Sequence, residues 1–491
     1  MNRIERIRNA PFEVQDLVFQ YLIKNGRQTE WGKKYEYDKI RNQEDYRKFV
    51  PVSSYEDIFP YIDRMMCGEQ NVLWNSHITW FSKSSGTTNA KSKFIPVSRE
   101  ALQDCHYRGG KDLLGIYFTH YPDSNLFAGK SLGIGGSYEV NPRNKNSYYG
   151  DISAVIMSNL PKWAEFSRVP GIHIALMSEW ESKLDKMADA IKNQNVTNIS
   201  GVPTWTVVLF EKILEKTGKK NMLEVWPQFE VFFHGAVAFH PYRELFKKFF
   251  PSERVCYFET YNASEGFFAF QDLDKSDEML LMLDHGVYYE FIPVEEFESK
   301  TPKTLRLDEV ELNKNYALLI STNAGLWRYK IGDTIRFTSL SPFRIKITGR
   351  TKHYINAFGE EVVIENAESA MTIACKKTNA IINNFTAAPI YFSETNKGAH
   401  EWVVEFQTPP ESLEEFALAL DEALKQLNSD YEAKRYKDLA LQRPIIHAVS
   451  EGTFYKWLKK KGKLGGQNKV PRLSNSREFV EEILSIATTS T

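Results

Sequence analysis

Residue types that can hold phosphate groups gather in one polar loop, which consists of Ser84, Ser85, Gly86, Thr87 and Thr88. Hydroxyls and backbone N–H groups donate hydrogen bonds to phosphate oxygens, and a glycine lets the backbone approach a ligand closely. Lys91 and Lys93 follow and add positive charge. The spacing is not that of a Walker A loop, because Lys91 stands where the second glycine of that motif belongs. Taken alone, a loop of this composition is more often a solvated surface turn.

A second polar segment runs from Tyr261 to Gly266 and follows an apolar strand expected at Arg254–Phe258. Open α/β sheets bind ligands at strand ends of this kind. A tyrosine ring such as that of Tyr261 can lie flat on a purine. A carboxylate such as that of Glu265 can hold Mg²⁺, which prefers hard oxygen ligands that it shares with phosphate. The alternative for this segment alone is a turn with a solvated glutamate.

A third segment runs from Gly325 to Asp333 and places the aspartate at the end of an aromatic strand. One carboxylate can accept hydrogen bonds from both ribose hydroxyls, as an acidic residue does in dinucleotide sites. The alternative is a strand-end turn, in which the Gly-Asp pair is common.

Two glycine-containing segments lie further along the chain. The segment Gly349–His353 pairs a glycine with charged residues between two differently patterned regions, which indicates an interdomain linker. The segment Gly465–Arg472 has two glycines before Lys469 and predicts a mobile loop that carries a cation. Most loop lysines are merely solvated, so this segment alone does not indicate a functional lysine.

The elements that must position these segments follow from the hydrophobic pattern. Residues 1–75 are predicted to be helical, including a short helix at Tyr55–Met66, and Ile78–Ser82 is predicted as a strand. Ser98 is a predicted N-cap for the next helix. Short apolar runs then alternate with helical stretches as far as about residue 290: Leu132–Gly135, Val196–Ile199, Val231–Phe233 and Val255–Phe258. This alternation predicts an α/β fold.

Strands dominate from Tyr288 to Ile347, and strands and helices alternate after Gly349, with an amphipathic helix at Leu413–Leu427. We therefore expect a large multi-layer N-terminal domain over residues 1–345, with β-sheets and flanking helices. A smaller, mobile α+β domain is expected over residues 346–491.

Composition excludes several classes of protein. The chain has 491 residues and a formal net charge of -1, so it has no general attraction to nucleic acid or to an anionic membrane. The scattered cysteines suggest no metal site and fit a reducing cytoplasm: Cys67, Cys105, Cys256 and Cys375. The N-terminal residues lack the apolar core of a signal peptide, and no run approaches the ~20 apolar residues of a membrane span. We expect a cytoplasmic monomer.

In their order along the chain, the motifs resemble the adenylate-forming superfamily of acyl- and aryl-CoA synthetases, luciferases and peptide-synthetase adenylation domains. More closely, the chain resembles the GH3 family of acyl acid amido synthetases, which conjugate acids such as auxin, jasmonate or benzoates to amino acids. The matching phrases are Ser84–Thr88 with Lys93–Pro96, Tyr261–Gly266, Tyr316–Asp333 and Gln467–Arg472. VPVSSYEDIFPYIDRM and GEQNVLW also match the N-terminal region of that family, so the resemblance covers essentially the whole chain.

This resemblance implies that the loop at 84–88 binds the phosphates of ATP. It implies roles for the other residues: Gly235 and Ala236 along the adenine, Tyr261 beside it, Ser264 in nucleotide binding, Asp333 on the ribose, Glu265 with Mg²⁺, Arg350 and Lys352 at a hinge, and Lys469 as a mobile catalytic lysine. Residues 133–160 do not align with the longer acyl-pocket segments of the plant enzymes, so the resemblance does not identify the acid.

The implied reaction is activation of a carboxylic acid by ATP, followed by transfer of the acyl group to an amine, with an amino acid as the expected acceptor. The candidates for the base that deprotonates the amine are lone histidines, which are more often structural: His106, His234, His240 and His353. An acyl-CoA ligase shares the first step and is one alternative. A non-catalytic protein that binds nucleotide and acid is the other, although Glu265, Asp333 and Lys469 are all present.

Overall fold

The computed structural model describes residues 2–84, 93–236, 239, 242–297, 299–350, 354–355, 360, 362–390, 398–428, 431–432, 435, 441–464, 469–474 and 476–488. The chain divides into two compact units. The first unit comprises Met1–Ala236 with Ser252–Ile347, and the second comprises Val237–Pro251 with Thr348–Thr491. The chain therefore passes between the units at three places. Both units combine helices with sheets, which confirms the predicted α/β class.

Eleven strands of the described part of the first unit form one mixed sheet, in the order β12-β13-β14-β15-β11-β10-β9-β8-β7-β3-β6. Their bounds are β3 (Lys130–Gly133), β6 (Arg168–Val169), β7 (Val196–Gly201), β8 (Val231–Gly235), β9 (Cys256–Ala263), β10 (Gly266–Phe270), β11 (Met279–Leu281), β12 (Val287–Pro293), β13 (Asn315–Thr322), β14 (Tyr329–Leu340) and β15 (Phe343–Arg350). The patterning from Tyr288 to Ile347 predicted the strand-rich half correctly.

Strand β9 is where this sheet changes character. Strands β6, β3, β7, β8 and β9 run parallel to one another. Beyond β9, strands β10, β11 and β15 pair antiparallel. The carboxyl ends of the parallel strands therefore lie at one edge, where open α/β sheets bind ligands. The hairpin between β9 and β10 turns at that edge.

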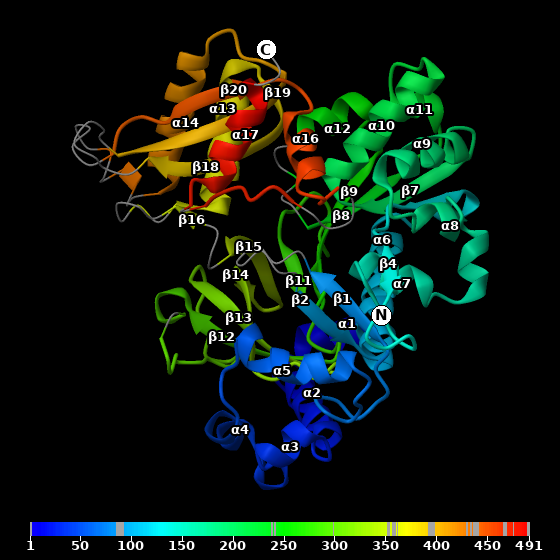
Figure 1. Ribbon diagram of the computed structural model, residues 1–491, viewed down its shortest axis with the longest axis vertical. Helices are drawn as coiled ribbons and strands as arrows, with labels where there is room; N and C mark the ends of the chain where they lie inside the picture. Colours follow the sequence, from blue (N-terminus) through cyan, green and yellow to red (C-terminus); the bar gives the residue numbers. More distant parts are fainter. Residues whose placement is uncertain are drawn as a thin grey trace. The chain divides into compact units, whose positions relative to one another are not determined.

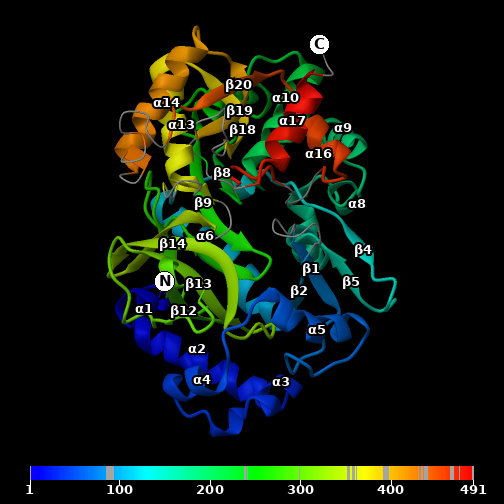
Figure 2. The same ribbon diagram turned by 60° about the vertical axis from the view of Figure 1, so that its left-hand side comes forward.

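A smaller sheet of the first unit has the order β2-β1-β5-β4. Figure 2 shows these strands side by side. Their bounds are β1 (Trp80–Ser84), β2 (Lys93–Val97), β4 (Tyr138–Val140) and β5 (Tyr148–Gly150). Pairing of Trp80 with Val97 fixes the start of β1, so the strand lies two residues later than the predicted Ile78–Ser82.

Helix α6 (Tyr107–His120) packs on the large sheet and follows a one-turn π-helix at Ala101–His106. The ring of Tyr117 contacts the rings of Phe233 and Phe258, which places α6 against β8 and β9. The Ser98 hydroxyl accepts a hydrogen bond from the Ala101 N–H at 2.9 Å, so its predicted capping role is confirmed. The helices that follow α6 in the first unit are α7 (Ile152–Ser158), α8 (Ile172–Ala175), α9 (Trp180–Ile191), α10 (Pro203–Thr217) and α11 (Met222–Val225).

The N-terminal region is helical, as predicted, with α1 (Asn2–Asn9), α2 (Pro11–Gly26), α3 (Glu30–Lys34), α4 (Gln43–Phe49) and α5 (Tyr55–Met66). Helix α5 begins at a capping box in which Ser54 and Asp57 exchange hydrogen bonds, so it matches the predicted bounds. Figure 1 shows these helices in blue, and α2 packs on strand β12. None of the helices in the described ranges combines the length and the apolar composition that a membrane span requires.

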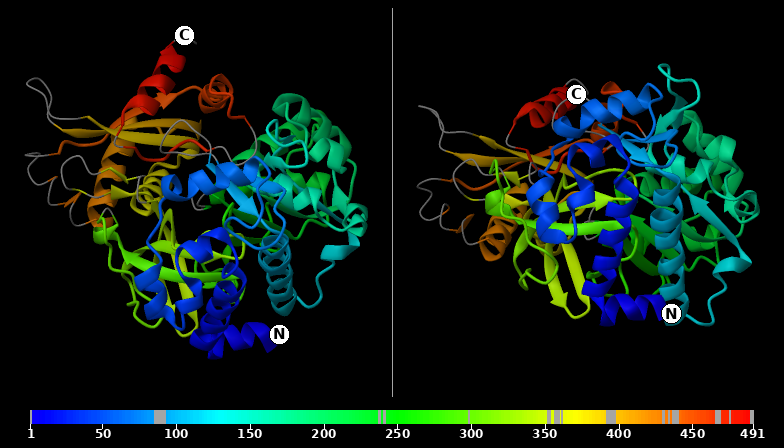
Figure 3. Two further views of the ribbon diagram at one scale, coloured as in Figure 1. Left: turned by 60° about the horizontal axis from the view of Figure 1, so that its bottom comes forward. Right: turned by 90° about the horizontal axis from the view of Figure 1, so that it is seen from below.

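The second unit contains a three-stranded sheet in the order β18-β19-β20 and a short hairpin of β16 with β17. The bounds are α12 (Arg243–Phe249), β16 (Tyr354–Ile355), β17 (Val362–Val363), α13 (Ile364–Thr378), β18 (Ile381–Ile390), β19 (Ala399–Thr408), α14 (Leu413–Leu427), β20 (Ile445–Val449), α16 (Thr453–Lys460) and α17 (Glu478–Thr488). Helix α14 has the predicted bounds, with Ser412 as its N-cap. Figure 3 shows α17, in red, on the opposite face of this sheet from α13 and α14.

Candidate active site

The phosphate-binding loop predicted at 84–88 leaves the small sheet between β1 and β2. Ser84 is the last residue of β1 and pairs with Lys93, the first residue of β2. The predicted residues Ser85, Gly86, Thr87 and Thr88 lie outside the described residues, as does Lys91. The described base of the loop therefore carries one serine and one lysine of the motif.

A hydrogen bond joins strand β1 to the hairpin that carries the second motif. The Ser82 hydroxyl donates to the Ser264 hydroxyl at 2.9 Å, and both side chains are buried. Ser264 and Glu265 form the two-residue turn between Ala263 and Gly266. The strand that leads into the first motif is thus bonded to the turn of the second motif, although the two are far apart in the sequence.

Tyr55 is a further residue at this edge, and sequence reasoning did not single it out. Burial raises the pKa of Tyr55 to about 12, and the negative charges of Glu56, Asp63 and Glu265 add to the shift. The Tyr55 hydroxyl accepts a hydrogen bond from the Phe94 N–H at 2.8 Å, and the Lys93 ammonium lies 5.4 Å from the centre of its ring. Tyr55 therefore contacts the base of the phosphate loop. Its one signal in the sequence is its place in the N-terminal phrase VPVSSYEDIFPYIDRM.

The second and third motifs meet through a direct hydrogen bond. The Tyr261 hydroxyl donates to Asp333 Oδ2 at 2.5 Å, and both residues are buried. The ring of Tyr261 packs edge-on against Phe268 with 4.9 Å between ring centres. The hydroxyl therefore orients the carboxylate that was predicted to hold ribose. Packing of the Tyr261 ring near adenine stays a prediction.

The strand end at Gly235 and Ala236 has the backbone geometry of a close-approach site. A side chain at position 235 would bring its Cβ within 2.5 Å of the Thr260 carbonyl oxygen, so only glycine fits there. Ala236 has a φ of +73°, a conformation that costs a non-glycine residue of order 1 kcal/mol or more. Strain of this kind concentrates where a fold meets a ligand, which supports a role for this strand end.

A buried lysine holds the loop after β3, in the region where the acid pocket could not be assigned from the sequence. The Lys183 ammonium donates to the carbonyl oxygens of Gly135 and Gly136, at 2.5 and 3.0 Å. Burial lowers its pKa to about 8, and the neighbouring Asp151 opposes that shift. The Asp151 carboxylate in turn accepts from the Ser137 N–H at 2.9 Å. A lysine within the helical pattern of α9 gave no signal in the sequence.

Two of the predicted candidates for the base are buried in this unit. His106 Nδ1 lies 3.0 Å from the side-chain oxygen of Asn262, and His234 lies within β8. Both therefore have the burial typical of structural histidines. His240 and His353 lie outside the described residues.

Acid should destabilise the fold through His106. Burial lowers its pKa to about 4, with the nearby His285 adding to the effect, so the native state favours the neutral ring. The contribution of the neutral His106 ring to the free energy of unfolding is fully present above the unfolded-state pKa near 6.5, and it is lost as the pH falls toward 4. Between pH 7 and pH 4 the wild type should lose about 3 kcal/mol more stability than His106→Asn. Urea denaturation at both pH values measures this difference, and parallel losses would contradict it.

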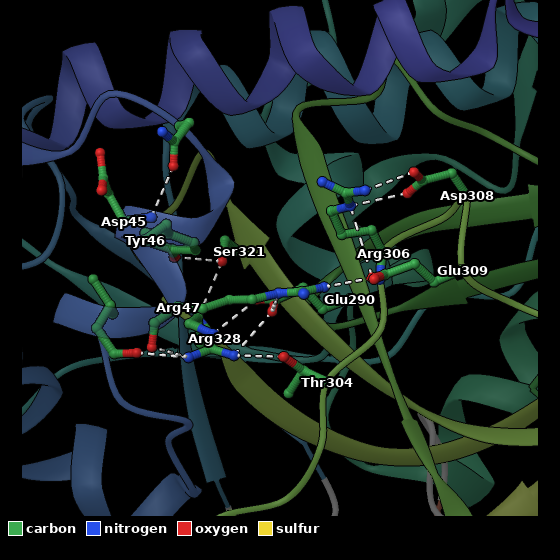
Figure 4. Close-up of polar contacts among 12 residues, drawn as sticks. Asp45, Tyr46, Arg47, Glu290, Thr304, Arg306, Asp308, Glu309, Ser321 and Arg328 are labelled. Carbon is green, nitrogen blue, oxygen red and sulfur yellow. Dashed lines mark hydrogen bonds and ion pairs between the residues drawn. The ribbon is translucent and has the colours of Figure 1, made fainter.

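A buried ion pair anchors the third motif (Figure 4). The Arg328 guanidinium donates to both carboxylate oxygens of Glu290, at 2.8 and 2.9 Å, and to the Thr304 hydroxyl at 2.8 Å. It also donates to the Val50 carbonyl at 2.7 Å. Arg328 immediately precedes β14, the strand that carries Asp333, so this network fixes where that strand begins.

One group of possible metal ligands exists among the described residues, away from the predicted Glu265. Oxygens of Asp112 and Asp284 and a ring nitrogen of His285 lie within 4.8 Å of one another. The Arg3 guanidinium forms ion pairs with both aspartates. The guanidinium of Arg3 thus offsets one of the two negative charges of this group.

In the second unit, the segment around Lys469 is anchored on its C-terminal side. Lys469 is half-buried, and Arg472 is buried with its guanidinium 4.5 Å from the ring centre of Phe385. Arg472 also donates to the Tyr242 hydroxyl at 2.8 Å. The predicted hinge residue Arg350 is the last residue of β15, and Lys352 lies outside the described residues.

The chain matches three domain descriptions of one family along most of its length. Residues 1–255 match the GH3 family N-terminal domain, residues 280–350 the GH3 family central domain, and residues 365–478 the GH3 family C-terminal domain. The indole-3-acetic acid-amido synthetase GH3.3 of Arabidopsis thaliana is 24% identical, over 97% of this chain and 91% of the relative.

Solved structures share the fold. The GH3.15 acyl acid amido synthetase in complex with 2,4-DB has a TM-score of 0.80 at 18% identity, over 98% of this chain and 94% of that one. A 2-hydroxyisobutyryl-CoA ligase in the postadenylation state has a TM-score of 0.62 at 11% identity, over 99% of this chain and 94% of that one. With domain matches over more than half of its length, the chain belongs to the GH3 family.

Proposed function

We propose that this chain is an ATP-dependent acyl acid amido synthetase. It activates a carboxylic acid as an acyl-adenylate and passes the acyl group to an amine, with an amino acid as the expected acceptor. The observation that carries the proposal is a pair of hydrogen bonds: Tyr261–Asp333 joins the second and third motifs, and Ser82–Ser264 joins the second motif to β1, the strand that leads into the first. A solvated turn at each motif, the simpler alternative, would not bury and connect these side chains.

The reaction has two steps. A carboxylate oxygen of the acid attacks the α-phosphorus of ATP in line, an anhydride bond forms, and pyrophosphate leaves. The nitrogen of the amine then attacks the acyl carbon, the amide bond forms, AMP leaves, and the amine gives up a proton. Acid and ATP are both anions, so the site must neutralise charge before they can meet.

Different residues of the first unit bind the ribose, the adenine, the phosphates and the Mg²⁺ of ATP in this proposal. Asp333, oriented by Tyr261, accepts from the ribose hydroxyls, and the strand end at Gly235 and Ala236 lies along the adenine. The loop at 84–88 donates to the phosphates. Glu265 is the carboxylate that would hold Mg²⁺, which when bound supplies positive charge to the phosphate oxygens.

Three residues of the second unit or its border complete the proposal. Lys469 stabilises charge at the α-phosphate in the first step. Arg350 and Lys352 closely follow the place where the chain enters the second unit after Ile347, and we propose that they form a hinge. Turning at this hinge would exchange Lys469 for the groups that the second step needs.

Asp333→Ala should weaken ATP binding about 10- to 100-fold, raising the KM for ATP and lowering kcat. It removes charge-assisted hydrogen bonds worth about 1.5–3 kcal/mol each. Calorimetric titration with ATP measures the Kd directly. Tyr261→Phe is the matched control, because it keeps the carboxylate and removes only the group that orients it, so its loss should be smaller. An unchanged Kd in Asp333→Ala would show that the ribose role is wrong.

An acyl-CoA ligase is the second candidate function, since a 2-hydroxyisobutyryl-CoA ligase has the same fold. Both enzymes release pyrophosphate in the first step, so only the acceptor separates them. Pyrophosphate release should be measured over a panel of acids, each with a panel of amino acids and with CoA. Amide products with no thioester support the amido synthetase, and thioester formation alone would replace it.

The proposal includes a cytoplasmic monomer that acts on small molecules without nucleic acid or membrane. The formal net charge of -1 gives no attraction to polyanions, and the described cysteines are all free thiols. Gel filtration of the purified chain tests the oligomeric state.

A further inference from the structure

The β9–β10 hairpin that carries Glu265 has a bulge close to its turn. Ala263 pairs with Gly266 across the two-residue turn, and Asn262 pairs with Phe267 at the next position. The register then shifts between Phe267 and Ala269, which marks a bulge close to the turn. A bulge interrupts the ladder of hydrogen bonds and bends its strand. Contacts from outside the hairpin therefore help to fix the turn, and the Ser82–Ser264 hydrogen bond is one of them.

Two consecutive residues of the π-helix before α6 supply such contacts. The Cys105 sulfur accepts a hydrogen bond from the Phe267 N–H at 3.1 Å. His106 Nδ1 lies 3.0 Å from Asn262 Oδ1. Because Asn262 and Phe267 face each other in the ladder, the two contacts hold both strands at the same level. Cys105 and His106 are both buried, so solvent does not compete for these bonds.

The packing around these contacts leaves the hairpin little freedom. A Cβ at Gly109, on the first turn of α6, would lie 2.5 Å from the Phe267 ring, and a Cβ at Gly266 would lie 3.3 Å from the Cys105 sulfur. His285 Nδ1 lies 3.1 Å from the Phe267 carbonyl oxygen. Single π-turns of this kind occur frequently at functional sites, since the extra residue redirects side chains.

We propose that His106 is a positioning residue for catalysis, which acts through Asn262 to fix the Ser264–Glu265 turn and the Glu265 carboxylate. The amide oxygen of Asn262 accepts, so Nδ1 of His106 carries the proton. Burial keeps the ring neutral by lowering its pKa to about 4, so this donor persists across the working pH range. His106 itself touches neither substrate nor metal in this role.

The test compares variants in the pyrophosphate-release assay at varied Mg²⁺ concentration. His106→Leu keeps most of the volume but removes the donor, and should raise the Mg²⁺ concentration for half-maximal rate about tenfold, the scale of one lost buried hydrogen bond. His106→Asn places an amide donor near the position of Nδ1 and should restore the constant to within about threefold. Asn262→Ala should reproduce the loss, and combining it with His106→Leu should add nothing further, because the two act as one unit.

Two further variants separate the possible failures. His120→Leu is the matched control, since it removes a histidine at the far end of the adjoining helix α6, and the Nε2 of this histidine lies 2.9 Å from the Asp272 carbonyl oxygen. It should lower the melting temperature without changing the Mg²⁺ dependence. Equal shifts in His106→Leu and His120→Leu would overturn the positioning role, and so would normal Mg²⁺ dependence in Asn262→Ala, which is informative even if His106→Leu fails to fold.

Because this role rests on the proposed function, Glu265→Gln serves as the reference. A changed Mg²⁺ dependence in Glu265→Gln with none in Asn262→Ala or His106→Leu would overturn only the positioning role. Normal Mg²⁺ dependence in Glu265→Gln would instead overturn the metal role of Glu265 in the proposed function. A changed Mg²⁺ dependence in all three variants supports both the metal role of Glu265 and the positioning role of His106.

Discussion

Replacing Arg328 with methionine should lower the free energy of unfolding by at least about 3 kcal/mol, in the range of about 3–5 kcal/mol seen when a buried ion pair loses one partner. Arg328 and Glu290 are both buried, and two hydrogen bonds of 2.8 and 2.9 Å join them. Methionine keeps the bulk but leaves the Glu290 carboxylate without its main partner. Arg47, 3.5 Å from Glu290, keeps one counter-charge nearby. Urea denaturation followed by tryptophan fluorescence measures the loss.

Figure 4 also shows the matched control for this prediction. Arg306 pairs with Asp308 at 2.7 Å, but the side chains are 35% and 41% exposed. Arg306→Met should therefore cost less than about 1 kcal/mol, as for other exposed ion pairs. The double variant Arg328→Met with Glu290→Leu should recover part of the loss, because it removes the unpaired charge. Equal losses in Arg306→Met and Arg328→Met would mean that burial does not set the strength of the Glu290 pair.

The same ion pair illustrates what the sequence could and could not predict about the site. Local patterning predicted the motif that contains Arg328, but it wrongly placed Asp333 at the end of a strand, whereas Asp333 lies inside β14 (Tyr329–Leu340). It could not predict that Arg328 bonds to Glu290, since the two lie on different strands and neither periodicity nor capping relates them. The helices Tyr55–Met66 and Leu413–Leu427 have the predicted bounds. Each begins directly after its capping serine, Ser54 or Ser412, so neighbouring residues determine where it starts.

The connections within the site required the structure for the same reason. The bond between Ser82 and Ser264 and the bond between Tyr261 and Asp333 span 182 and 72 residues of sequence, respectively. The buried Lys183 looked like an ordinary polar position of an amphipathic helix. Patterns identify residue types that suit a chemistry, whereas tertiary pairing decides which of them meet.

The proposed turning of the second unit must involve more than one segment. The chain passes between the units at Ala236–Val237 and at Pro251–Ser252 as well as after Ile347. A rotation at Gly349–Lys352 alone would leave two other connections to absorb the change. The positive φ of Ala236 lies at one of them, so this strained residue is a second place where backbone angles can change.

Lys469→Ala should depress formation of the acyl-adenylate about 10²–10³-fold, the usual cost of losing one group that stabilises charge in the transition state. The lysine would act only when the second unit presents its loop to the α-phosphate. Reaction of a pre-formed acyl-adenylate with the amine should therefore continue at close to the wild-type rate. Single-turnover assays of each half-reaction, the first by pyrophosphate release and the second by AMP release, measure the two effects separately.

Lys463→Ala is the matched control, because this lysine lies six residues earlier in the same stretch of the second unit. Removing a solvated lysine should change stability by no more than about 0.5 kcal/mol and leave both half-reactions unchanged. If Lys469→Ala behaves like this control, Lys469 has no place in the site. If both half-reactions fall equally, Lys469 stays catalytic but the two steps do not use different placements of the second unit. A loss confined to adenylation supports the proposal that the second unit presents Lys469 only in the first step.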